Sequence, residues 1–521
     1  MGIMKKSVFA GVLGLALVLG VGVTGAAWYT GKRAESYLDQ TLGQINGALQ
    51  ALREWDGDAV PVIDLMELER GVFSTTRRYR LTLTPAKGVT GAAPQEIRFI
   101  ETLDHGPFPL QRLKAGRYAP AMVAGRIQLE DTATVKDWFA KAEGKVPVSG
   151  EYTIDYSKQY SARVDVRAMV LQHDSVMLRV WNMTGDVAYS ADRQRGVVQW
   201  QADKLSVLSQ GKRHAGIELV APSWRYELSR TPDGARATQQ KLVFKTGTLA
   251  TRNRPFWILE DTSLAFGTTQ AGRLWGAEAG IDIGAFRGWG KGFGTGLGLG
   301  LNPGINPGLN PDADAGSDTD LEHVSLQLAA AVKNWDLNAA RALVGTSAAL
   351  ANRDYPTEYG ADAQQLMASM ALHLQQFLVG GPTLASSLTV RTASGISAMK
   401  LDLGLTAPDP TQSPLQSPLH GMLKKLDFNM ALSKQLLRDV IVMRQGAPGV
   451  AVARAAQRMA AARQAEAIAA ALADRGLASI DGDALLARVR IADYGLVESN
   501  GAFMPFDTFL GHVSGMMRRL D

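Results

Sequence analysis

Residues 176–190 read VMLRVWNMTGDVAYS, and they belong to a series of similar segments, from 151 to 269, that decides the fold. The segments are rich in β-branched and aromatic residues, which favour strands, and turn-forming residues separate them. The other members are YTIDYS (152–157), ARVDVRAMVL (162–171), GVVQWQADKLSVLS (196–209), GIELVAPSWRYELS (216–229), QKLVFKTGTLAT (240–251) and FWILEDTSLAFGTT (256–269). Because no helical pattern falls between them, the sequence predicts a large antiparallel sheet of meander type.

The same two-residue period extends upstream of this series. Tyr79, Leu81 and Leu83 alternate with polar residues, and residues 96–103 (EIRFIETL) repeat the alternation. His105-Gly106-Pro107 then interrupts the pattern. We therefore expect strands in the region before residue 151 as well.

The second half of the chain mixes helical and strand-like patterns, so the predicted fold class is α+β and β-rich. Residues 321–333 fit a strand or a helix equally well, because a short apolar run has no decisive period. Helices are predicted at 338–350, 361–379 and 448–475, and strands at 384–392, 396–406, 425–433 and within 485–510. The 448–475 helix is rich in alanine with few larger apolar residues, which predicts loose packing on the body.

An uncharged run at the N-terminus predicts a membrane anchor. Residues 7–31 lack charge, Lys5 and Lys6 precede them, and Lys32 and Arg33 follow. About 20 apolar residues in a helix span a bilayer, whereas a cleaved signal peptide has a shorter apolar core. We favour an uncleaved anchor with the short head in the cytoplasm, and cleavage after a signal peptide is the alternative.

A glycine-rich tract separates the two halves. It contains the repeated Asn-Pro-Gly of LNPGINPGLNP (301–311), and proline every fourth residue excludes both helix and central strand. The predicted organisation is a cytoplasmic head (1–7), a transmembrane anchor (8–30), a juxtamembrane helix (31–60), an antiparallel β-rich domain (61–285), a flexible loop or linker (286–320) and a mixed α+β domain (321–521).

Composition excludes several kinds of site. The chain of 521 residues has no cysteine, which excludes disulfides, thiolate nucleophiles and thiolate metal sites. The net charge of +5 is small for this length, and the basic residues are scattered rather than clustered, so no nucleic-acid partner is expected. None of the seven histidines has metal-ligand spacing, and we expect no metal, no cofactor and no catalytic residues.

Five residues are candidates for contact with a ligand or partner. His105 lies in a predicted turn, where it is suited to titrate near neutral pH, although bonding to local backbone explains it as well. Tryptophans on strands can line a binding face, but more often they pack a sheet core. The candidates are His105, Phe108, Trp181, Trp200 and Trp224.

Several stretches resemble one known group of proteins. Residues 4–35, the segment GVFSTTRRY (71–79) and the turn HGPFP (105–109) are similar to the YdgA/YihF-like bacterial family, whose function is unknown. The tract at 288–311 and the final strand near 498–504 depart from the family pattern. The resemblance implies an inner-membrane-anchored envelope protein with a β-rich periplasmic body, and it implies no activity.

Three functions are compatible with these features. The first is a binding or scaffold protein that presents an extended sheet to lipid or to an envelope protein partner, with the inner-membrane bilayer as its support. A lipid site requires a continuous apolar face without a covering layer. The second is a homo-oligomeric structural element, and the third is an envelope hydrolase with dispersed residues. We favour the binding or scaffold protein.

Overall fold

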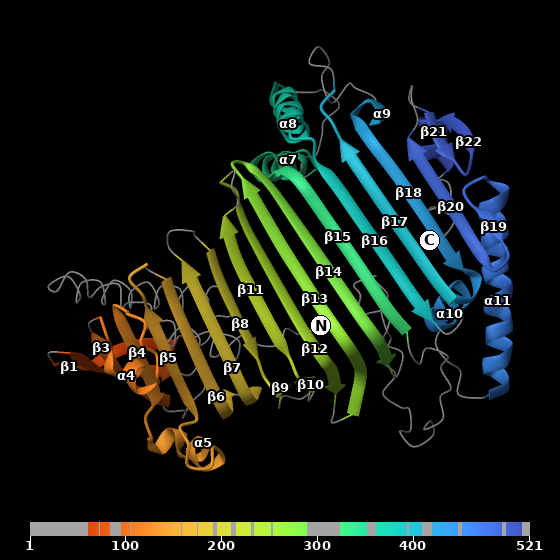
Figure 1. Ribbon diagram of the computed structural model, residues 1–521. Coiled ribbons are helices and arrows are strands. Elements are labelled where there is room, and N and C mark those ends of the chain that lie inside the picture. Colours follow the sequence, from red (N-terminus) through yellow and green to blue (C-terminus); the bar gives the residue numbers. More distant parts are fainter. Residues whose placement is uncertain are drawn as a thin grey trace. The chain divides into compact units, whose positions relative to one another are not determined.

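Figure 1 shows the computed structural model of the chain. It describes residues 61–71, 73–83, 95–105, 107–157, 159–173, 176–190, 195–209, 215–230, 234–251, 254–288, 324–351, 361–392, 395–408, 419–445, 451–491 and 496–512. The predicted anchor, the predicted juxtamembrane helix and most of the 286–320 tract lie outside these residues. Among the helices of the described ranges, none combines the length and the apolarity that crossing a membrane would need.

The described residues form two compact units. Unit 1 comprises Met1–Arg230 and Gln239–Phe256, and unit 2 comprises Thr231–Thr238 and Trp257–Asp521. Both units are β-rich and their sheets are antiparallel, as the strand series predicts. The predicted domain boundary at 286–320 stays a prediction, because residues 289–323 are not described.

Unit 1 is built from strands β1 to β12 (Figure 1). They are β1 (Pro61–Arg70), β2 (Ser74–Leu83), β3 (Gln95–His105), β4 (Val123–Leu129), β5 (Val148–Ile154), β6 (Gln159–His173), β7 (Val176–Ser190), β8 (Arg195–Gln201), β9 (Lys204–Ser209), β10 (Ala215–Val220), β11 (Ser223–Arg230) and β12 (Arg236–Thr251). From β1 to β8, each strand pairs with the next. This meander confirms the predicted antiparallel arrangement.

Strand β7 pairs with two different strands along one of its edges. Its first part, Val176–Trp181, pairs with β9, and its second part, Thr184–Ser190, pairs with β8. Asn182 lies between the two parts with φ of 44°, a left-handed conformation that asparagine tolerates better than most residues. Its side-chain amide donates to the Asp203 carboxylate over 2.7 Å, which holds the change of partner in place.

Two short helices interrupt the described residues of unit 1, whereas no helix was predicted between residue 61 and the second half of the chain. They are α4 (Leu110–Lys114) and α5 (Lys136–Lys141), the latter preceded by a 3₁₀ turn at Ala133–Val135. Trp138 of α5 is buried and donates from Nε1 to the carbonyl of Val170 over 3.0 Å. Helices of five and six residues are too short to show a helical period in sequence.

Unit 2 contains a second series of long strands. They are β13 (Arg254–Ala271), β14 (Leu274–Gly288), β15 (Val324–Asp336), β16 (Thr383–Thr392), β17 (Gly395–Leu405), β18 (Leu423–Ser433), β19 (Ser479–Asp481), β20 (Ala484–Ile491), β21 (Leu496–Ser499) and β22 (Ala502–Pro505). Pairing runs in chain order from β13 to β18, and β20 then joins β18. The 321–333 segment fitted both patterns, and its described part, residues 324–333, belongs to a strand, β15.

The described residues of unit 2 form five helices. They are α7 (Leu337–Ala351), α8 (Ala361–Val379), α9 (Leu419–Met422), α10 (Lys434–Gln445) and α11 (Ala451–Asp474). Helices α7, α8 and α11 confirm the three predicted helices. Strands β16, β17, β18 and β20 likewise confirm the strands predicted in this half.

The alanine-rich helix α11 packs tightly, and the expectation of loose packing was wrong. Ala461, Ala465 and Ala469 are fully or almost fully buried, four residues apart on one side of the helix. Ala461 and Ala465 contact Ile441 of α10, and Ala469 packs against Leu485 of β20. Small side chains allow this close approach, so burial here depends on alanine rather than on the sparse larger residues.

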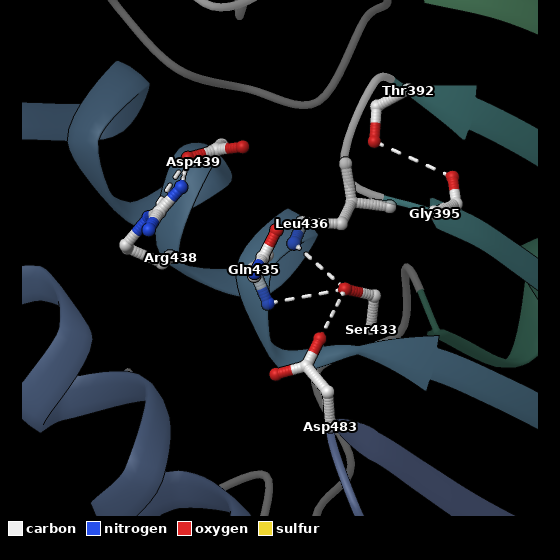
Figure 2. Close-up of polar contacts among 8 residues, drawn as sticks. All are labelled: Thr392, Gly395, Ser433, Gln435, Leu436, Arg438, Asp439 and Asp483. Carbon is white, nitrogen blue, oxygen red and sulfur yellow. Dashed lines mark hydrogen bonds and ion pairs between the residues drawn. The ribbon is translucent and has the colours of Figure 1, made fainter.

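Ser433 ends β18 and caps α10 (Figure 2). Its hydroxyl accepts hydrogen bonds from the amides of Gln435 and Leu436 at 3.2 and 3.5 Å, and it donates to the Asp483 carboxylate at 3.0 Å. Serine at this position satisfies backbone donors that have no partner within the helix. The hydroxyl is therefore fully engaged in holding α10 to the residues before β20.

Replacing Ser433 with alanine is expected to lower the free energy of unfolding by about 1–2 kcal/mol, because the cap is lost. Chemical denaturation of the variant measures this change. Ser347→Ala is the control, because that exposed hydroxyl only bonds the Val344 carbonyl within α7. Equal stability of the two variants would contradict the capping role.

Candidate functional site

The sheet of unit 2 carries a continuous apolar row across seven strands. In the antiparallel register, each member lies directly opposite the next, so all of them share one face of the sheet. This apolar row consists of Leu264, Ile281, Leu328, Leu388, Met399, Met430 and Ala487, from β13, β14, β15, β16, β17, β18 and β20. Six strand spacings of about 4.8 Å give the row a length of about 29 Å.

The next row on the same face is also mostly apolar. Residues two positions along a strand point to the same face. These are Phe266, Ala279, Ala330, Ser386, Leu401, Phe428 and Val489. The apolar row is therefore part of a broad apolar face and not a single line of side chains.

The opposite face of this sheet carries small and polar residues. Shifting each strand by one residue from the apolar row gives a polar row, since successive side chains alternate between faces. The polar row consists of Ala265, Gly280, Ala329, Ser387, Lys400, Asn429 and Arg488. The sheet is therefore amphipathic across its whole width.

One end of the apolar face is covered, and the part from β13 to β17 carries exposed side chains. At β18 and β20, Met430 and Ala487 pack under Ala469 and Leu472 of α11. Leu264, Leu328 and Met399 are instead 36%, 38% and 38% exposed. In the neighbouring row, Phe266 is 43% exposed. Large apolar side chains on a central sheet face are normally covered, so this opening is a candidate binding surface.

The predicted candidate residues all belong to unit 1, away from this open face along the chain. Trp200 and Trp224 lie opposite each other on β8 and β11, with ring centroids 6.4 Å apart, and Trp224 stacks on Tyr226 at 6.0 Å. Trp181 is separate, with the Lys204 ammonium 5.5 Å from its ring centre. Phe108 is exposed between β3 and α4. The structure brings together two of the five candidates, Trp200 and Trp224.

His105 lies at the end of β3 beside a buried charge. Its Nε2 is 2.7 Å from the hydroxyl of Thr75. Burial lowers the pKa of His105 below its ordinary value, the positive charge of Arg77 lowers it further, and Asp104 opposes both effects. His105 is therefore held toward its neutral form by unit 1 and does not line the open apolar face.

NMR titration of His105 is expected to give a midpoint below the ordinary value of about 6.5. When the folded pKa is depressed, the unfolded chain binds the proton more tightly, so this group destabilises the fold as pH falls below about 6.5 and has no effect above it. His105→Gln is expected to remove that part of the pH dependence. A midpoint above 6.5 would contradict the assignment.

A buried ionic network forms the polar centre of unit 1. Glu101 of β3 is only 1% exposed. Its carboxylate accepts from the Tyr152 hydroxyl at 2.6 Å, from Tyr79 at 2.9 Å and from Arg77 at 3.3 Å. Burial raises the pKa of both tyrosines, and the Glu101 charge raises them further. The tyrosines therefore remain neutral donors, and the network is suited to hold β2, β3 and β5 together.

Sequence reasoning missed both the network and the open face. In the sequence, Glu101 belongs to an alternating strand pattern, and that pattern does not show that the side chain of Glu101 points into the core. The apolar row had a sequence signal in VSLQLAAAVK (324–333) and GISAMKLDLGL (395–405), where apolar residues recur every second position. The register that joins these positions comes only from the fold. No group of acidic or histidine residues suited to a metal ion occurs among the described ranges.

Comparison with known proteins places the chain among uncharacterised bacterial proteins. A family model described as "Bacterial protein of unknown function (DUF945)" matches residues 4–296 and 306–507. The match is interrupted inside the glycine-rich tract, as expected for an insertion. No solved structure matches the chain.

Three curated relatives share part of the sequence. "Protein YdgA" of Escherichia coli is 27% identical over 50% of this chain and 52% of its own length. "Uncharacterized protein YihF" of Escherichia coli is 22% identical over 31% of this chain and 33% of its own. An "Uncharacterized protein" of Haemophilus influenzae is 27% identical over 31% and 42%. The matches thus span about half or less of each relative.

Proposed function

The chain belongs to this DUF945 family, and on that premise we propose that it is a membrane-anchored envelope protein that binds lipid acyl chains on the open apolar face of unit 2. The observation that carries the proposal is the apolar row with its exposed members Leu264, Leu328 and Met399. Burial of each methylene of a ligand there contributes roughly 0.8 kcal/mol.

The composition of the row favours an acyl chain over a protein partner. The cores of protein interfaces are enriched in arginine and aromatic residues, and also in methionine. The apolar row contains no aromatic residue and no arginine, and consists of leucine, isoleucine, methionine and alanine. Flexible methionine side chains also adapt to irregular apolar ligands. The row's length of about 29 Å allows an extended alkyl chain to lie across several strands.

The location in the envelope rests on the N-terminal sequence. The uncharged run at 7–31 is long enough to span a bilayer, and the charges flanking it favour a cytoplasmic head. The body would then stand in the periplasm, attached to the inner membrane and close to a supply of lipid.

Mass spectrometry of ligands that co-purify with residues 32–521, expressed in a bacterial periplasm, tests the proposal. Phospholipid or fatty acid is expected in near-stoichiometric amount. Leu328→Gln places an amide against the alkyl chain and is expected to lower lipid occupancy at least about fivefold. Ala329→Gln is the matched control, because the neighbouring residue lies on the polar face.

Each other outcome of this experiment counts against the acyl-chain site. A protein without lipid, even after lipid is added, would favour a protein partner on the same face. Equal loss of lipid in Leu328→Gln and Ala329→Gln would show that the lipid binds elsewhere.

A further inference from the structure

Two adjoining clefts lie on the sheet face of unit 1 that carries Arg126, Glu151 and Arg163. Their volumes are about 590 and 370 Å³, and both are lined by Arg112, Thr153, Ser161, Ala188 and Val197. Helix α4 and the residues that follow it supply one wall, through Gln111, Arg112 and Arg117. Because the two clefts share these residues, one ligand is able to occupy both.

A row of charged and polar side chains from neighbouring strands forms the floor of the larger cleft. Each residue lies opposite the next in the antiparallel register, and opposite charges mostly alternate. The row consists of Arg126, Glu151, Arg163, Asp186, Gln199 and Arg225. Such cross-strand pairs stabilise a solvated sheet face on their own and need no ligand.

The pairing within the row does not account for all the arginines. Arg126 pairs with Glu151, and Arg225 pairs with Glu227 and bonds Gln199. The two clefts together are lined by six arginines and by three carboxylates, which are those of Glu151, Asp155 and Asp186. Within the described part of the chain, the guanidinium groups of Arg112, Arg117 and Arg195 have no carboxylate partner.

Arg112 stands where the two clefts meet. It lines both of them, and its Nε is shielded from solvent without a hydrogen-bond acceptor in the described structure. A guanidinium in such a wall is suited to bind a phosphate through two parallel hydrogen bonds. Arg117 on one side and Arg195 on the other extend the positive charge into each cleft.

We propose that the joined clefts of unit 1 bind an anionic ligand that bears phosphate groups, held by Arg112, Arg117 and Arg195. The site is formed by residues of unit 1 and by none of the residues of the apolar row. A test of this site is therefore independent of any test of the acyl-chain site. The same chemistry would recognise the phosphorylated headgroup of a lipid or a free phosphate compound.

Isothermal titration calorimetry of the full-length chain tests this site with two probes. One probe is inorganic pyrophosphate, and the other is dihexanoyl phosphatidic acid below its critical micelle concentration. The triple variant Arg112→Gln, Arg117→Gln, Arg195→Gln is expected to bind at least about tenfold more weakly than the wild type, because charged hydrogen bonds to the anion are lost. The control is Lys136→Gln, Lys141→Gln, Lys145→Gln, which removes three exposed charges of the α5 region outside the clefts.

The two probes separate the possible sources of the ligand. Binding of both supports a free phosphate compound or a headgroup, and binding of phosphatidic acid alone supports a lipid headgroup. Absence of binding by both probes would overturn the proposal. It would also be overturned if the lysine control weakened binding as much as the arginine variant, since the effect would then reflect net charge alone.

Discussion

Replacing Glu101 with leucine is expected to lower the free energy of unfolding by about 3–5 kcal/mol, because a buried charge loses its partner. Arg77 would keep its buried guanidinium without the carboxylate, which now lies 3.3 Å away. The hydroxyls of Tyr79 and Tyr152 would lose their acceptor as well. Denaturant unfolding followed by tyrosine and tryptophan fluorescence measures the change.

A second variant separates the charge from the hydrogen bonds. In Glu101→Leu with Arg77→Leu, no charge stays buried, so stability is expected to recover by about 1–3 kcal/mol relative to the single variant. Glu96→Leu on the same strand is the control, because its ion pairs with Arg80 and Arg98 are largely exposed and contribute less than about 1 kcal/mol. A double variant that is less stable than Glu101→Leu would contradict the role of the buried charge.

Gly125→Ala is expected to cost about 2–4 kcal/mol, through overpacking and a lost buried hydrogen bond. A Cβ at this position of β4 would overlap the ring of Tyr152, so the ring has to move. Movement of the ring breaks the bond from the Tyr152 hydroxyl to Glu101. Glycine is therefore required here by the close approach of the tyrosine, and thermal or denaturant unfolding measures the cost.

The neighbouring strands provide the controls for Gly125. A Cβ at Gly185 of β7 would make only ordinary contacts, the nearest being 3.7 Å from the Gln199 carbonyl, so Gly185→Ala is expected to be nearly neutral. In a Tyr152→Ala background, Gly125→Ala is expected to lose most of its effect, because the overlapping ring is absent. Additive costs of the two substitutions would show that they act separately.

The strands were predictable because their residues alternate in sequence. The pattern of the segments from 151 to 269 predicts an antiparallel sheet, and the same two-residue period predicts β2 and β3. Helices α7, α8 and α11 were predictable because each is long enough to show a helical period or alanine enrichment. The short helices α4 and α5 carry no such signal, and only tertiary packing selects them.

The candidate site was less predictable than the fold, because register decides it. Alternation shows that Leu326 and Leu328 share a face, but not that Leu328 lies opposite Leu388 and Ile281. The tryptophans attracted attention to unit 1 by their size, although their rings pack against each other or beside Lys204. The open face consists of ordinary aliphatic residues, and their exposure is not visible in sequence.

Photocrosslinking in living bacteria tests the acyl-chain site most directly. The full-length chain would carry the photoreactive amino acid benzoylphenylalanine in place of Leu328, or in place of Ala329 as the control on the opposite face. After irradiation, mass spectrometry identifies what is attached. Lipid attached at position 328 and not at 329 is the result that the account predicts. Protein attached at 328, or equal lipid labelling at both positions, would contradict it.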